Sequence, residues 1–92
     1  MSSSASITIL YFAGASTSTG LTAETIPIPN DPGLPLSALP DLLISRHSNA
    51  KDLKKVLDSS QWSVDAEMVD EPEKVILKGG EEVAVIPPVS GG

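Results

Sequence analysis

The residues with the clearest chemical potential stand at the end of the sequence, where Gly91-Gly92 follows Pro87-Pro88-Val89-Ser90. Glycine has no Cβ atom, so a Gly-Gly segment can follow almost any backbone path and can enter a narrow channel in another protein. Such a segment ends in an α-carboxylate. The predicted functional group is therefore the terminal carboxylate of Gly92 rather than a side chain.

Side-chain chemistry has little support elsewhere in the sequence. There are no cysteines, which excludes disulfides, thiolate catalysis, cysteine-based metal sites and a carrier that works through a cysteine persulfide. His47 is the only histidine, and its expected place at a helix end indicates a surface role rather than catalysis. Gly79-Gly80 is typical of a turn, since no Lys-Ser or Lys-Thr helix start follows it as in a phosphate-binding loop.

A group of carboxylates lies in the second half of the chain, at Asp65, Glu67, Asp70, Glu71 and Glu73. Their spacing lacks the regular order of oxygen ligands that a calcium-binding loop requires. We therefore predict a solvated acidic face and no metal site.

Length and composition limit the function further. Ninety-two residues, 40% of them hydrophobic, form one domain with a modest core and little room for a substrate cavity of its own. The net charge of −6 and the absence of a basic stripe disfavour nucleic acids and anionic membrane surfaces, and favour a partner with a basic groove. The sequence shows neither a signal peptide nor an apolar stretch of about 20 residues, so a cytoplasmic location is expected.

Four segments have the pattern of β-strands. Residues 7–13 are almost all apolar, which indicates a central strand covered on both faces. Residues 24–29 alternate, and their two prolines share one parity, which suits an edge strand. Residues 62–69 indicate a short hairpin with Trp62 in the core, and residues 82–86 form the last strand.

Leucines at helical spacing over residues 36–43 predict the main helix, with Ser37 as its N-cap and Pro40 in its first turn. A second short helix is expected to start at Asn49 as N-cap and to bury one apolar face, which carries Leu53, Val56 and Leu57. Residues 14–20 are small and polar and are predicted to form a loop.

The order of these elements predicts an α+β fold: a mixed sheet of four to five strands packed on one main helix, with the first and last strands side by side in the middle. This is a ubiquitin-like β-grasp. Residues 1–88 are expected to form the domain, with residues 1–6 disordered. Residues 89–92 are expected to form a flexible C-terminal tail.

The segment from Gly79 to Gly92, with its Glu-Glu-Val-Ala-Val-Ile-Pro-Pro-Val-Ser-Gly-Gly ending, resembles the tail of the MoaD-like sulfur carriers, the small subunits of molybdopterin synthase in the MoaD/ThiS family. Residues 9–13, Ile-Leu-Tyr-Phe-Ala, resemble the first strand of that family. Two positions depart from the family pattern, because Gly80 stands where an acidic residue is common and Asp65 where Asn is expected. Neither lies in the tail.

The resemblance implies a specific chemistry for Gly92. An E1-like adenylyltransferase would use ATP to convert the carboxylate to an acyl-adenylate, and a sulfur donor would then replace AMP to leave a thiocarboxylate. The large subunit of the synthase would accept this tail, and the sulfur would attack cyclic pyranopterin monophosphate to build the dithiolene of molybdopterin. The resemblance also implies a heterotetramer with the large subunit, catalysis only as half of that synthase, and no permanently bound cofactor.

The tail and one surface would serve these partners. Pro87 and Pro88 would aim the tail outward, Val89 and Ser90 would anchor it, and Gly91 with Gly92 would pass through a constriction. By position in the family pattern, a hydrophobic patch on the open face of the sheet would meet both partners; the matching residues are Phe12, Met68 and Ile86.

Other functions use the same end of the chain. A ubiquitin-like protein modifier would be conjugated to lysines through Gly92, and a tRNA-thiolation carrier would do so as well as carry sulfur. Thiamin-pathway carriers are shorter and lack the Pro-Pro pair. In a passive interaction domain the tail would be incidental. The Pro-Pro-Val-Ser segment before Gly-Gly favours the molybdopterin synthase subunit.

Overall fold

The computed structural model describes residues 5–29 and 33–88. Its strands are β1 (Ala5–Tyr11), β2 (Ala23–Ile28), β3 (Leu34–Pro35), β4 (Gln61–Val64), β5 (Glu67–Met68), β6 (Ile76–Leu77) and β7 (Glu82–Ile86). Its helices are α1 (Ala13–Thr19), α2 (Leu39–Arg46) and α3 (Leu53–Ser59), with the 3₁₀ turns η1 (Leu36–Ala38) and η2 (Pro72–Lys74). No helix of these described ranges is long and apolar enough to cross a membrane.

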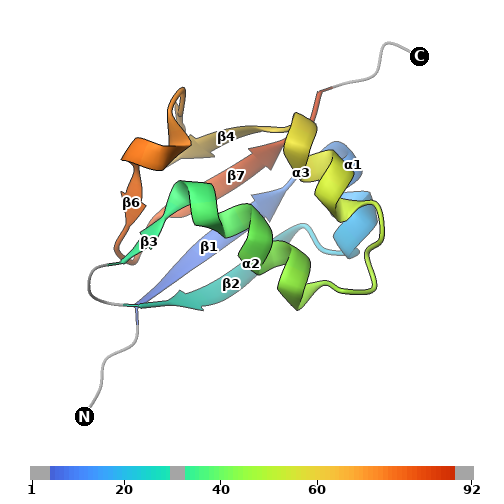
Figure 1. Ribbon diagram of the computed structural model, residues 1–92, viewed down its shortest axis with the longest axis horizontal. Coiled ribbons are helices and arrows are strands. Elements are labelled where there is room, and N and C mark those ends of the chain that lie inside the picture. The colour runs from blue at the N-terminus through green and yellow to red at the C-terminus, as the bar shows by residue number, and fades with distance from the viewer. Residues whose placement is uncertain (1–4, 30–32, 89–92) are drawn as a thin grey trace.

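Five strands form the main sheet in the order β2-β1-β7-β4-β5 (Figure 1). The two most apolar strands, β1 and β7, pair in parallel at its centre, while the other neighbours are antiparallel. This confirms the predicted central pair, and it confirms that the proline-containing β2 is an edge strand. The short strands β3 and β6 form a separate antiparallel pair.

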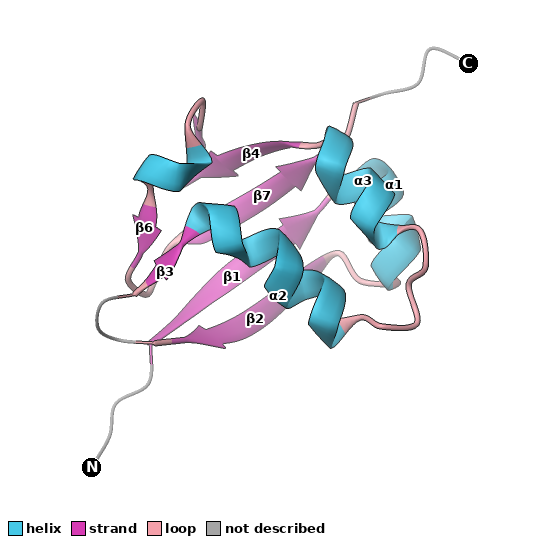
Figure 2. Cartoon of the chain, viewed as in Figure 1, coloured by secondary structure: helices cyan, strands magenta, loops and turns pink. Residues whose placement is uncertain are grey.

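The three helices cover one face of the main sheet (Figure 2), and the core lies between the two layers. Strand alternation sends every second side chain of β1 into this core, and helix periodicity does the same for α2 and α3. The buried side chains of these three elements and of β4 and β7 include Ile7, Ile9, Tyr11, Leu39, Leu43, Leu53, Leu57, Trp62, Val83 and Val85. Each fully buried aliphatic side chain contributes about 1.5–3 kcal/mol. The α+β ubiquitin-like β-grasp class is thus confirmed.

The helical layer consists of three short helices, where the sequence predicted one main helix and a second short one. The additional helix is α1, in residues 14–20 that were predicted to be a loop, and that prediction is wrong. Ala15 is fully buried, so packing on the core overrides the weak helix propensity of the Ser and Thr residues. Gly20 ends the helix with φ +76°, and its N–H donates to the Ser16 carbonyl oxygen.

Three expected boundaries also differ. Helix α2 is preceded by the 3₁₀ turn η1 and has Ala38, not Ser37, at its N-cap, although Pro40 does lie in its first turn. Helix α3 begins after Asp52 rather than Asn49, because a turn follows α2 first. Strand β1 begins at Ala5 and pairs with β2 from there, two residues before the expected start at residue 7.

The β4–β5 hairpin turns on two residues with positive φ, Asp65 at +51° and Ala66 at +72°. Two consecutive left-handed residues make the turn that matches the twist of paired strands, and glycine is favoured at the second position. Asp65 tolerates this conformation and also accepts a hydrogen bond from the Glu82 N–H on its Oδ1 at 3.0 Å. Its own N–H donates to the Glu82 carbonyl oxygen at 2.8 Å. The turn is therefore tied to the start of β7.

A tightly packed glycine shapes the loop before β7. A Cβ atom on Gly79, which has φ +128°, would lie 2.8 Å from the Ala5 Cβ, so only glycine fits where the loop before β7 passes β1. The Glu81 carboxylate accepts hydrogen bonds from the N–H groups of Lys78 and Gly79 at 2.9 and 2.7 Å. Burial would raise the pKa of Glu81, but these backbone hydrogen bonds and the Lys78 charge outweigh it and lower that pKa.

A polar network ties the end of α2 to the sheet. The Glu24 carboxylate on β2 accepts a hydrogen bond from the Tyr11 hydroxyl at 2.7 Å and lies 2.7 Å from His47 Nε2. Arg46 Nη2 lies 3.5 Å from the other carboxylate oxygen. The Glu24 side chain is only 13% exposed. His47 therefore has a definite structural partner, which the expected surface role did not foresee.

These contacts set the acid–base properties of the network. Burial alone would raise the pKa of Glu24, but hydrogen bonds from Tyr11 and His47, with the His47 and Arg46 charges, outweigh it and lower that pKa below 4.5. Burial, the hydrogen bond to Glu24 and the charge of Glu24 raise the pKa of Tyr11 far above its usual value. The Tyr11 hydroxyl thus stays a neutral donor above the pH at which an exposed tyrosine ionises, because its pKa is raised.

Replacing Ala66 by glycine is expected to stabilise the protein by about 0.5–1 kcal/mol, because it removes the strain of a left-handed alanine. Urea unfolding measures this as a higher midpoint at constant slope. The control Ala23→Gly, in extended β2, should instead destabilise by a similar amount. A lower midpoint for Ala66→Gly would contradict the turn geometry.

Acid should destabilise the wild-type protein partly through Glu24. Because the pKa of Glu24 is lowered on folding, its ionised form adds stability above pH 4.5, and this contribution is lost as the pH falls below that value. Glu24→Gln should therefore be less stable than the wild type at pH 7 and lose less stability on acidification. Urea unfolding at pH 7 and at about pH 3.5 measures the difference.

The control for this experiment is Glu67→Gln, which removes an exposed carboxylate from β5. It should retain the acid sensitivity of the wild type. Equal pH dependence for Glu24→Gln and the wild type would show that the network does not hold Glu24 in its charged form.

Candidate functional site

The last described residues lead out of the centre of the sheet. Ile86 ends β7 opposite Gln61 of β4, and the pairing stops there because Pro87 and Pro88 have no N–H to donate. Pro87 is buried and Pro88 is exposed. The chain therefore leaves the domain from an anchored point, and Pro88 is the first exposed residue beyond it. The predicted tail residues Val89, Ser90, Gly91 and Gly92 lie outside the described residues.

The position of this exit follows from the parallel pairing of β1 and β7. The register joins Tyr11 to Val85, so β7 ends at the same end of the sheet as β1, next to α1 (Figure 1). Val83 and Val85 are fully buried and hold β7 against the helices. Main-chain bonds on both sides and buried side chains below thus fix the strand that leads to the tail.

The three predicted docking residues share the sheet face away from the helices. Leu10 pairs with Ala84 on that face. Ile86 follows two residues further along β7, and Phe12 is the extended residue directly after β1. Met68 lies on the same face, because it pairs with Ser63 and Ser63 also pairs with Ala84. Side chains of equal parity point to one side of a sheet, so the register brings Phe12, Met68 and Ile86 onto one surface.

Their exposure differs. Phe12 is 48% and Met68 54% exposed, whereas Ile86 is half-buried. Among the described residues, only two further large hydrophobic side chains have comparable exposure, Leu21 and Ile76. Two of the three docking residues are therefore apolar side chains left at the surface, and their docking role stays a prediction.

The structure also places Trp62 and the acidic residues that the sequence singled out. Trp62 is 7% exposed and belongs to the core, as expected. No group of three His, Asp or Glu side chains within residues 5–29 and 33–88 lies close enough to hold a metal ion. Of the five predicted acidic residues, Asp65, Glu67, Asp70 and Glu71 line a groove beside the hairpin, and Glu73 does not. The sequence did not indicate this groove, because its apolar residues come from separate segments.

Comparison with known proteins agrees with this geometry. The sequence model of the ThiS family matches residues 9–92. A molybdopterin synthase sulfur carrier subunit of Aspergillus niger is 46% identical over 94 aligned positions that cover 100% of both chains.

Solved structures share the fold. A Pyrococcus furiosus chain described as a candidate molybdopterin converting factor subunit 1 superimposes with a TM-score of 0.73 at 25% identity, over 92% of this chain and 99% of that one. A complex of subunits 1 and 2 of the molybdopterin-converting factor from Helicobacter pylori contains a chain with the same fold, with a TM-score of 0.62 and 22% identity over 95% and 99% of the two chains. By full-length similarity, the chain belongs to the ThiS family and, within it, to the molybdopterin synthase sulfur carrier subunits.

Proposed function

We propose that this chain is the sulfur-carrying subunit of molybdopterin synthase and that Gly92 carries the sulfur as a C-terminal thiocarboxylate. The observation that carries the proposal is the match to sulfur carrier subunits along the whole chain, Gly-Gly ending included. Two further features support it. The chain has no cysteine that could hold sulfur, and Pro88 is exposed just beyond the end of the central strand β7.

Loading begins with activation of the carboxylate. A carboxylate is a poor electrophile, because it is an anion with a poor leaving group. An E1-like adenylyltransferase joins it to AMP from ATP and releases pyrophosphate. The terminal sulfur of a donor persulfide then attacks the carbonyl carbon of Gly92, and AMP leaves. A thiol cleaves the sulfur–sulfur bond of the resulting acyl disulfide, which releases the thiocarboxylate and leaves the donor sulfur in a disulfide with that thiol. ATP belongs to the activating enzyme, so this chain needs no nucleotide site of its own.

Delivery takes place on the large subunit. The tail enters the large subunit, and the thiocarboxylate sulfur attacks a carbon of cyclic pyranopterin monophosphate and displaces an oxygen substituent. Water then hydrolyses the thioester, so that the sulfur stays on the pterin and Gly92 returns to a carboxylate; two such transfers supply the two sulfur atoms of the dithiolene. The large subunit supplies the basic and acid–base groups, while this chain supplies sulfur and its position. The subunits assemble as a heterotetramer, and the chain is catalytic only as part of it.

The open face of the sheet holds the carrier on both partners in turn. Phe12, Met68 and Ile86 lie on one face near the tail exit, and contact there would keep the tail at a high effective concentration in the partner's channel. A methionine adapts its shape to different surfaces, which suits a face that meets two proteins.

Intact-mass measurement tests the proposal directly. The chain is incubated with a cognate adenylyltransferase, ATP and a sulfur donor. Replacement of one oxygen by one sulfur on Gly92 is the expected result. Ladders of conjugates on lysines would instead indicate a protein modifier. An unchanged mass would indicate a passive domain, and either of these outcomes would contradict the proposal.

Gly91→Ala is expected to lower the sulfur-transfer rate in a reconstituted synthase at least about tenfold, because a Cβ atom would obstruct the channel that accepts the tail. The thermal midpoint of the isolated chain should stay unchanged, since the substitution alters no residue of the described strands and helices. Ser90→Ala, which adds no bulk in the tail, is the matched control. A normal transfer rate for Gly91→Ala would refute a narrow channel.

Ile86→Glu should weaken binding to the large subunit at least about tenfold, or about 1.4 kcal/mol, because it buries a carboxylate in an apolar interface. Calorimetric titration measures the affinity, and circular dichroism checks that the variant is folded. Leu21→Glu places the same charge on an exposed residue of the α1–β2 loop and should bind normally. Unfolding of the Ile86 variant would assign that side chain to the core instead.

A further inference from the structure

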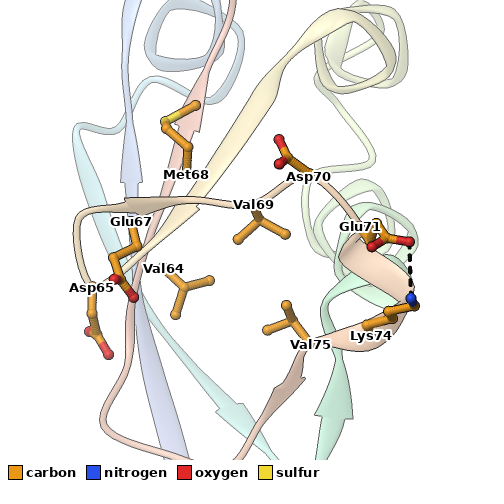
Figure 3. A pocket seen from close by; sticks show the side chains of 9 residues that line it. All are labelled: Val64, Asp65, Glu67, Met68, Val69, Asp70, Glu71, Lys74 and Val75. Atoms are coloured by element: carbon orange, nitrogen blue, oxygen red, sulfur yellow. Dashed lines mark ion pairs between the residues drawn. The ribbon is translucent and has the colours of Figure 1, made fainter.

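A groove of about 440 Å³ lies beside the β4–β5 hairpin (Figure 3). One side is the hairpin itself, and the other is the segment that runs through η2 to Val75. Three valines make its floor, Val64 from β4, Val69 after β5 and Val75 before β6, and their side chains point toward a common space (Figure 3). All three are half-buried, so the floor packs on the core below and keeps apolar surface open above.

Carboxylates surround this floor. Glu67 and Asp70 are exposed at its rim, and Glu71 pairs with Lys74 at 3.2 Å. Asp65 also lines the groove while it accepts the hydrogen bond from the Glu82 N–H. Four carboxylates and one ammonium give the groove a formal charge of −3. An apolar floor with an anionic rim fits a side chain that has an aliphatic stem and a cationic head.

The groove is also placed to assist docking. Val69 and Met68 are consecutive, so they point to opposite sides of the β5 segment, and Met68 belongs to the open face described above. Since β5 is the edge of the sheet, a protein that covers Met68 can reach the groove around that edge. Val64 pairs with Val83, three residues before the end of β7, which puts the groove about 10 Å from the tail exit along the strands.

We propose that this groove docks a segment of the large subunit that presents a lysine or arginine beside an aliphatic side chain. This inference rests on the proposed function and adds a second attachment point away from the tail. A divalent cation is a poorer occupant, because half-buried valines leave it no ligands on one side and no group of three His, Asp or Glu side chains in the described ranges lies close enough to bind it. Electrostatic attraction at this rim speeds encounter with the large subunit without touching the reacting sulfur.

The test compares two single charge reversals. Asp70→Lys reverses a charge at the rim, and Asp58→Lys makes the same change on α3 in the helical layer. Glu67→Lys is a second rim variant in case Asp70→Lys fails to fold. Each full-length chain is titrated calorimetrically into the purified large subunit at about 0.05 M and about 0.5 M salt, and transfer is measured with saturating large subunit.

The rim variants should bind about tenfold more weakly than the wild type and Asp58→Lys at low salt. The difference in affinity between the rim variants and the wild type should become smaller at high salt, because the screening length falls from about 14 Å to about 4 Å. The transfer rate at saturation should stay unchanged, since the tail is intact. Equal weakening by Asp58→Lys would reduce the effect to net charge and overturn the inference.

Different results would contradict the docking role of the groove and the proposed function. A wild-type chain that binds the large subunit but never forms the dithiolene would overturn the proposed function, while the affinities would still decide the groove. Normal dithiolene formation together with equal affinity of the rim variants and the wild type would overturn the groove alone.

Discussion

The structure depends on the parallel pairing of β1 with β7 at the centre of the sheet. The first and last strands of the domain are neighbours, so the core closes only when almost the whole chain has been placed. Val83 and Val85 are held by main-chain bonds on both sides and by the helices beneath. The same pairing decides that the chain leaves the sheet from its middle and not from an edge. A partner that grips the sheet therefore also fixes the starting point of the tail.

This arrangement assigns reach and fixed shape to different parts of the chain. A residue that must travel between two enzymes needs a long reach, while a docking surface needs a fixed shape. Here the fixed shape is the five-stranded sheet, and the reacting group is proposed to be a main-chain carboxylate beyond it. The proposed chemistry then requires no catalytic side chain in the core. Its polar groups serve structure instead: the Glu24 network joins α2 to the sheet, and Glu81 holds the loop before β7.

The sequence predicted the fold class because its strongest signals were the ones that matter most for topology. Two apolar strands, a proline-marked edge and spaced leucines left few other arrangements. Helix α1 was missed because Ser and Thr carry little helix propensity, and only its packing through Ala15 reveals it. His47 and Glu24 are 23 residues apart, so no local pattern links them. The sequence did not reveal the groove for the same reason, since the valines of its floor come from segments on both sides of η2. The docking residues were named from the family resemblance and not from a local pattern, and what covers them is a property of a partner.

The central claim is that sulfur moves from the terminal carbonyl of this chain to the pterin precursor. The most direct measurement is a single-turnover reaction in which purified thiocarboxylate chain is mixed with the large subunit and cyclic pyranopterin monophosphate. Intact mass follows the chain while the dithiolene product is quantified. The account predicts that two thiocarboxylates revert to carboxylates for every dithiolene formed. Dithiolene formation while the thiocarboxylate remains intact, or loss of sulfur without dithiolene, would contradict it.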